Sequence, residues 1–220
     1  MKRVGLATFG VAGAIFYLAI GVWGWGSFSG YFSNPARLTI AVMMLSAGVA
    51  SAFSNSSGLG TGVREDKSNR WVLAPLIGAG LLLPWLTAYL DAHNEWVTGG
   101  QAIRWLGVGV CLLGICLRLI PVFELGRRFS GFVAIQPDHQ LKTDGLYRFI
   151  RHPSYLGLLI TAFGWALAFR CVLPGLAFTA INLIAIVARM NSEERLLVDQ
   201  FGEQFRAYKK RTWRLVPWVY

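Results

Sequence analysis

The sequence predicts an all-α integral membrane protein, and three observations carry that prediction. Hydrophobic residues make up 55% of the 220 residues and charged residues only 15%, whereas soluble domains carry about 25% charged residues. The apolar residues gather in long segments, and the basic residues gather in alternate connections between them. A chain of this size cannot bury so much apolar surface in its own core, so a bilayer is the expected solvent.

Six predicted helices account for the apolar segments. A helix that crosses a bilayer needs about 20 mostly apolar residues, and the first four candidates are residues 4–26, 38–53, 71–90 and 103–123. Residues 155–190 are too long for one crossing, so they predict a tight hairpin of the fifth and sixth helices, broken near Arg170, Cys171 and Pro174. The first segment also follows a basic start, but it is longer than the apolar part of a signal peptide.

The net charge of +10 comes from 21 basic and 11 acidic residues. With a cytoplasmic N-terminus, 17 of the basic residues fall on the cytoplasmic side, Arg118 falls within the fourth span, and three fall outside: Arg37, Arg104 and Arg170. The positive-inside rule therefore predicts that both termini are cytoplasmic. Because topology accounts for the charge, the sequence predicts no nucleic-acid partner.

Several residues within the predicted spans have more than one interpretation. Arg118 either extends to the cytoplasmic boundary or points inward near a site. The three cysteines show no CxxC spacing, so we expect neither a metal site nor a disulfide framework. Small residues let helices approach closely, which is the role predicted for Gly10, Gly13, Gly21, Gly24, Gly78, Gly80, Gly107, Gly109 and Gly114.

The polar residues that could carry chemistry follow residue 124. The connection 124–154 is basic and holds two of the three histidines, and residues 189–210 predict a basic amphipathic helix on the membrane surface. The apolar face of that helix is Leu197, Phe201, Phe205 and Tyr208. Arg189 and Glu193 are one turn apart and form either a helix salt bridge or part of a site. Glu194 is either a solvated neighbour or the partner of a loop arginine. Such a layer can hold a charged, water-soluble cofactor beside a lipid-like substrate.

Three stretches in this half resemble a known family. They are GLYRFIRHPSYLG from residue 145, RMNSEERLL from residue 189 and FGEQFRAYKKRTWRLVP from residue 201. Together they are similar to the isoprenylcysteine carboxyl methyltransferase family, and the related phospholipid N-methyltransferases look similar over the same region. The resemblance covers residues 124–217. It implies an integral membrane enzyme that uses S-adenosylmethionine, and a lipid or prenylated substrate that enters from the bilayer.

The resemblance also implies roles for individual residues. Arg189 matches the arginine that meets the substrate and is the predicted catalytic residue. Lys142 stands where the family has valine, so its contact would be made by the backbone. The cofactor contacts implied are Gln136, His139, Gln140, Leu141, Lys142, Tyr147, His152, Pro153, Ser154, Tyr155 and Glu193.

The predicted reaction is methyl transfer to a carboxylate, which is ionised at neutral pH and needs no general base. The alternatives are a phospholipid or amine N-methyltransferase, which would need a base, and an NADPH-dependent membrane reductase with a similar arginine-histidine-proline motif. The chain is expected to be one membrane domain. Residues 1–70 would form two accessory spans and a loop, residues 71–220 the methyltransferase core, and residues 124–220 the cofactor site.

Overall fold

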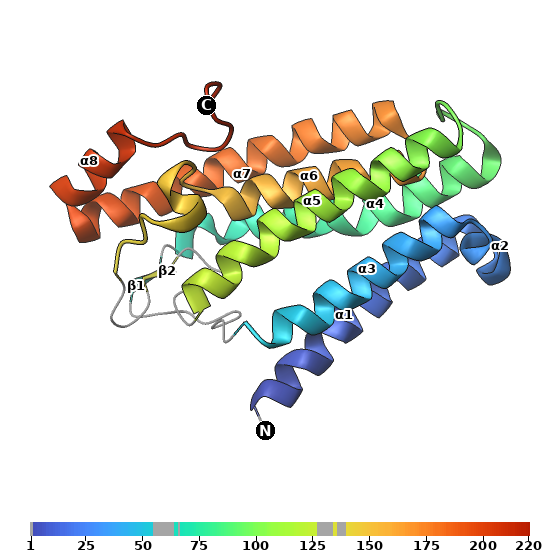
Figure 1. The fold of residues 1–220 in the computed structure, drawn as a ribbon, viewed down its shortest axis with the longest axis horizontal. Helices are drawn as coiled ribbons and strands as arrows, with labels where there is room; N and C mark the ends of the chain where they lie inside the picture. The colour runs from blue at the N-terminus through green and yellow to red at the C-terminus, as the bar shows by residue number, and fades with distance from the viewer. Residues whose placement is uncertain (1, 55–63, 66, 127–133, 136–139) are drawn as a thin grey trace.

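The part of the chain that the structure describes is almost entirely helical. It is a computed structural model, and it describes residues 2–54, 64–65, 67–126, 134–135 and 140–220. The long helices of this described part form one bundle, in which α1 and α3 are inclined to α4, α6 and α7 (Figure 1). They are α1 (Lys2–Trp25), α3 (Pro35–Ala52), α4 (Leu73–His93), α5 (Gln101–Leu125), α6 (Pro153–Ala168) and α7 (Val172–Phe201). The shorter elements are α2 (Phe28–Phe32), α8 (Glu203–Lys210), the 3-10 helices η1 (Lys67–Val72) and η3 (Gly145–Arg148), and the antiparallel pair β1 (Arg64–Glu65) and β2 (Ala134–Ile135).

The long helices coincide with the six apolar segments of the sequence, so the helical prediction is confirmed. The predicted hairpin is also confirmed, because α6 ends at Ala168 and α7 begins at Val172. Among the described residues, three helices are long and apolar enough to cross a membrane by length and composition: Arg70–His93, Gln101–Leu125 and Val172–Phe201. The number of membrane crossings stays a prediction.

The single helix predicted over residues 189–210 is wrong. Helix α7 continues to Phe201, and Gly202 stops it with a φ of 52°, a conformation that side-chain-bearing residues rarely adopt. Helix α8 then folds back at the end of the bundle (Figure 1). Phe205 and Tyr208 of the predicted apolar face are buried. These two side chains therefore pack on the protein and not on a membrane surface.

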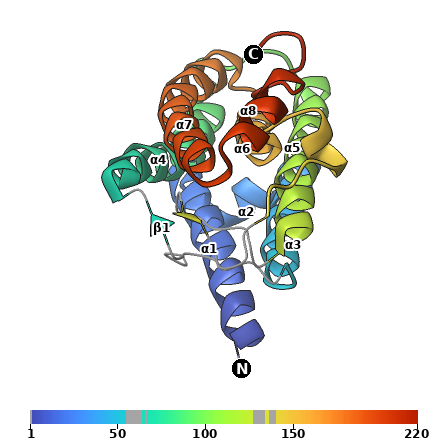
Figure 2. The same cartoon turned by 90° about the vertical axis from the view of Figure 1, so that its left-hand side faces the viewer.

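Helices α5 and α6 are antiparallel and touch along their length through glycines. A Cβ added at Gly107 or Gly114 of α5 would lie 2.3 Å from the Ala168 nitrogen or 2.4 Å from the Thr161 nitrogen. Gly157 and Gly164 of α6 face the α5 backbone in the same way, at Arg118 and Cys111. Figure 2 shows α6 between α5 and α7. The glycine seam, defined by these four glycines, fixes the first turn of α6 against Arg118.

The close-approach prediction holds at some of the other glycines and fails at the rest. Gly10 faces the Gly48 carbonyl, Gly21 faces the Tyr31 ring and Gly24 faces the Trp85 carbonyl. A Cβ would meet nothing within 4 Å at Gly13, Gly78, Gly80 and Gly109, so close helix contact does not explain those four.

Asp91 joins several elements at the end of the bundle opposite α8. Its side chain is fully buried, and it accepts hydrogen bonds from Arg104 at 2.6 and 2.8 Å and from Arg37 at 3.1 Å. The Arg170 guanidinium lies 2.7 Å from its Oδ1. Arg37 also lies over the Trp25 ring, 3.8 Å from its centroid. These three arginines are the predicted outside cations, and two of them, Arg37 and Arg104, are buried.

Replacing Asp91 with asparagine is expected to destabilise the folded chain by about 3–5 kcal/mol, because the buried arginines lose their counter-charge. Thermal unfolding in detergent measures the effect. Glu95→Gln is the matched control, since Glu95 is an exposed acid four residues further on, beyond the end of α4. Equal melting temperatures for the Asp91 variant and the wild type would show that the arginine cluster is not stabilised by this carboxylate.

Candidate active site

The histidine-proline motif, His152 and Pro153, lies at the start of α6. His152 is the N-cap residue of α6 and Pro153 is its first residue, a position that suits proline because the first helical N–H has no partner in the helix. Tyr155 follows in the first turn, and the rings of His152 and Tyr155 stack with centroids 5.5 Å apart. The motif therefore presents both rings at the end of the bundle where α8 lies.

Helix α7 completes a hydrogen-bonded network with this motif. The Tyr155 hydroxyl accepts a hydrogen bond from Arg189 Nε at 2.9 Å and donates one to Glu193 Oε2 at 2.8 Å. His152 Nδ1 lies 3.8 Å from the same carboxylate oxygen. Because Arg189 and Glu193 are one turn apart, both side chains reach the Tyr155 hydroxyl. An isolated salt bridge between Arg189 and Glu193 would not involve Tyr155.

Exposure differs sharply within this network. His152 and Arg189 are each 5% exposed, whereas the Glu193 side chain is 36% exposed. The network therefore opens to its surroundings at the Glu193 carboxylate. A ligand would meet an acidic group first, backed by a buried imidazole and a buried guanidinium.

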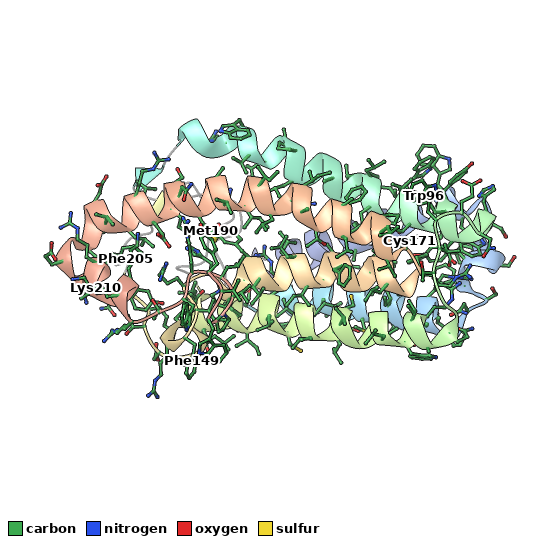
Figure 3. All side chains as sticks on the ribbon, turned by 90° about the horizontal axis from the view of Figure 1, so that it is seen from above. Trp96, Phe149, Cys171, Met190, Phe205 and Lys210 are labelled. Carbon is green, nitrogen blue, oxygen red and sulfur yellow. The ribbon has the colours of Figure 1, made fainter. Side chains whose placement is uncertain are left out.

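Arg118 reaches the same region from α5. Its Nη1 donates a hydrogen bond to Ser154 Oγ at 2.6 Å, and it lies within electrostatic range of Tyr155, Arg189 and Tyr147. The inward alternative from the sequence is therefore the one that the structure shows. Figure 3 shows this end of the bundle, which is marked by Met190 and Phe149. Cys171 and Trp96 mark the opposite end.

Tyr147 of η3 also lies near the network. Burial raises the pKa of the Tyr147 phenol, and the negative charge of Glu193 raises it further, so this phenol stays neutral. Its backbone carbonyl accepts a hydrogen bond from the Tyr208 hydroxyl at 2.6 Å. Helix α8 thereby anchors the turn that carries Tyr147.

Some of the predicted cofactor contacts in the segment before η3 lie among the described residues and others do not. Gln136 and His139 lie outside the described residues. Gln140 is exposed and Leu141 is half-buried. Lys142 Nζ pairs with Asp144 at 2.8 Å, and this hydrogen bond holds the pKa of the Asp144 carboxyl below its usual range. Contacts of these residues with a cofactor stay a prediction.

The sequence left two alternatives for Glu194, a solvated side chain or the partner of a loop arginine. It is 5% exposed, and its carboxylate lies 3.0 Å from Arg151 and 2.9 Å from Lys209. The loop-arginine alternative is therefore confirmed and the solvated alternative is wrong. The only signal in the sequence is that Glu194 directly follows Glu193, while its cationic partners are spread from residue 151 to residue 214.

Comparison with known proteins places this network inside the segment that matches a family model. Residues 105–199 match the isoprenylcysteine carboxyl methyltransferase (ICMT) family. The matched range contains His152, Tyr155, Arg189 and Glu193, and the resemblance that the sequence indicates is confirmed.

Individual relatives agree with the ICMT match. The chain is 33% identical over 114 residues to a protein-S-isoprenylcysteine O-methyltransferase of Schizosaccharomyces pombe, which covers 51% of this chain and 48% of the relative. It is 43% identical over 79 residues to methanethiol S-methyltransferase 1 of Bradyrhizobium diazoefficiens, which covers 36% of this chain and 27% of that protein. The chain spans about half the length, or less, of these relatives.

A solved structure shows the same fold. The structure described as the eukaryotic intramembrane Ras methyltransferase ICMT aligns with a TM-score of 0.60 at 20% identity. The alignment covers 92% of this chain and 73% of that chain. The arrangement of helices therefore extends beyond the segment where the sequences are similar.

Tyr208→Phe is expected to lower the stability of the folded chain by about 1 kcal/mol, since the Tyr147 carbonyl loses its hydrogen-bond donor. Burial raises the pKa of the Tyr208 phenol above its ordinary value of 10.0. The stabilisation is therefore present in full below the unfolded pKa and declines only as the pH rises towards the folded one. Unfolding midpoints of both proteins from pH 6 to 9 should differ by a constant amount, and a difference that shrinks over this range would contradict the assignment.

Proposed function

We propose that this protein is an integral membrane methyltransferase that moves a methyl group from S-adenosylmethionine to a lipid-like acceptor, the carboxylate of an isoprenylcysteine-type substrate. The observation that carries the proposal is the Arg189–Tyr155–Glu193 network. It places a guanidinium and a carboxylate on either side of one hydroxyl, within the range that matches the ICMT family. One group suits an anionic acceptor and the other suits a cationic cofactor.

The residues present fit S-adenosylmethionine by their chemistry. The accessible Glu193 carboxylate would hold the ammonium group of the cofactor, and His152 would hold its carboxylate or adenosine. Tyr147, Pro153, Ser154 and Tyr155 would line the same site, as would the predicted segment with Gln136, His139, Gln140, Leu141 and Lys142. When bound, S-adenosylmethionine supplies an electrophilic methyl group and requires no metal.

Arg189 would orient the acceptor. A C-terminal carboxylate is ionised at neutral pH, so the site has to align it rather than deprotonate it. Arg189 is buried and fixed by Tyr155, and Arg118 adds a second cation nearby. Correct placement of two reactants contributes about 7–11 kcal/mol to lowering a barrier.

Other acceptors fit the network less well. A protonated amine would be repelled by Arg189 and Arg118, and both an amine and a thiol must lose a proton before they attack. The similarity to a methanethiol S-methyltransferase nevertheless makes a thiol one acceptor to test. An NADPH-dependent reductase is the alternative of a different class.

The proposed arrangement in the membrane follows the charge pattern. Six helices cross the bilayer, both termini are cytoplasmic, and residues 1–70 form two accessory spans and a loop. The cofactor enters from the cytoplasm, where α8 and the basic connections lie, and the lipid part of the substrate enters from the bilayer.

Binding of S-adenosylhomocysteine tests the cofactor. The detergent-purified protein should melt at a higher temperature in its presence, since a ligand at about 100 times its Kd stabilises by roughly 2.7 kcal/mol. Glu193→Gln should weaken binding about tenfold or more, because it removes a charged hydrogen-bond acceptor. Glu203→Gln is the control, because Glu203 is an exposed acid that pairs with Arg206 on α8. Stabilisation by NADPH instead of S-adenosylhomocysteine would make the protein a reductase.

Arg189→Ala tests the acceptor. With an S-prenylated N-acetylcysteine, turnover should fall by about 100-fold or more while the Kd for S-adenosylhomocysteine changes little, since a charge-assisted pair with the carboxylate is lost. Parallel assays with a phospholipid amine and with a small thiol separate the acceptor classes. An Arg189 variant that loses cofactor affinity before turnover would reverse the proposed roles.

A further inference from the structure

The Glu194 carboxylate is surrounded by cationic and imidazole groups from three parts of the chain. Its Oε1 lies 3.0 Å from Arg151 Nε, 3.3 Å from His152 Nε2 and 3.2 Å from Arg214 Nε. Its Oε2 lies 2.9 Å from Lys209 Nζ. The side chain of Glu194 is 7% exposed. A carboxylate so buried is stable only when it is paired and hydrogen-bonded, as this one is.

These partners connect the motif before α6 to the C-terminal part of the chain. Arg151 Nη1 also donates hydrogen bonds to the Thr212 and Lys209 carbonyls. The backbone continues the contact, since Arg151 N donates to the Trp213 carbonyl at 2.8 Å and His152 N to the Arg214 carbonyl at 3.2 Å. Glu194 is therefore the acid at the centre of a contact between α7, α8, residues 211–214 and the histidine-proline motif.

The contact with Glu194 determines which nitrogen of the His152 ring faces the open side of the network. Nε2 faces Glu194, whereas Nδ1 faces the more exposed Glu193. Because carboxylates only accept hydrogen bonds, the 3.3 Å contact between Nε2 and Glu194 is a hydrogen bond only when Nε2 carries the ring proton. The Nδ1 lone pair then faces the open side of the network, where it can accept a hydrogen bond from the adenosine amino group of the proposed cofactor.

We propose that Glu194 is a positioning residue, which fixes the ring orientation and tautomer of His152 and holds the C-terminal segment against the histidine-proline motif. The inference rests on the proposed function, because it assigns His152 to the cofactor. Glu193 and Glu194 thus have different tasks although they are adjacent. Glu193 meets the ligand, and Glu194 acts through His152 and Arg151.

The experiment compares Glu194→Gln, Glu194→Asp and the control Glu203→Gln in the full-length protein in detergent. Three quantities are measured for each: the Kd for S-adenosylhomocysteine, the KM and kcat for S-adenosylmethionine with an S-prenylated N-acetylcysteine, and the melting temperature. The glutamine variant should raise the Kd and KM about tenfold or more while kcat changes less, because the charge that orients His152 is lost. The aspartate variant keeps the charge and should recover most of the affinity. Glu203→Gln should match the wild type.

A purely structural role for Glu194 predicts a different result. The melting temperature would fall in the glutamine variant while the folded protein bound S-adenosylhomocysteine with the wild-type Kd, and that result would overturn the proposal. If the wild type itself binds no S-adenosylhomocysteine, the proposed function fails at an earlier step. The two failures are therefore distinguishable.

A second measurement reads the His152 ring while Glu194 is intact. The chain has three histidines, so nitrogen NMR of histidine-labelled wild type, assigned with His93→Gln and His139→Gln, reports the tautomer of His152. At a pH where the ring is neutral, the proton should reside on Nε2. A proton on Nδ1 would contradict the proposed contact with Glu194 whatever the cofactor is.

Discussion

Three arginines from distant parts of the sequence share the Asp91 carboxylate, and the bundle depends on this interaction. Arg37 comes from α3, Arg104 from α5 and Arg170 from the turn between α6 and α7. Asp91 itself lies near the end of α4. Separating these elements would leave buried charges without a counter-charge, which is strongly destabilising. The elements therefore stay together at one end of the bundle. The opposite end is then free to carry the polar network.

The glycine seam holds α5 and α6 together along the length of the bundle. Because Gly107, Gly114, Gly157 and Gly164 bring the backbones of α5 and α6 into contact, α6 has little freedom to slide. Its first turn therefore stays beside Arg118, and Ser154 accepts a hydrogen bond from that side chain. A rigid helix pair is a suitable support for the proposed site, which would act mainly by alignment.

Two adjacent glutamates show how position on a helix divides roles. Glu193 faces the Tyr155 hydroxyl and is partly exposed, whereas Glu194 faces Arg151, His152, Lys209 and Arg214 and is buried. Successive residues of a helix are about 100° apart, so neighbours meet different surroundings. Periodicity placed Arg189 and Glu193 on one face, but it could not reveal which charges from α8 and the C-terminal segment surround Glu194.

The sequence by itself determined the six apolar helices, the hairpin at Arg170 and the segments that form the Tyr155 network, since hydrophobic length and local motifs act within a helix. Tertiary structure alone decided the partners of Asp91 and Glu194 and the inward direction of Arg118. These features depend on contacts between residues up to 79 positions apart. No local pattern encodes such pairings, because each is fixed only when the helices pack.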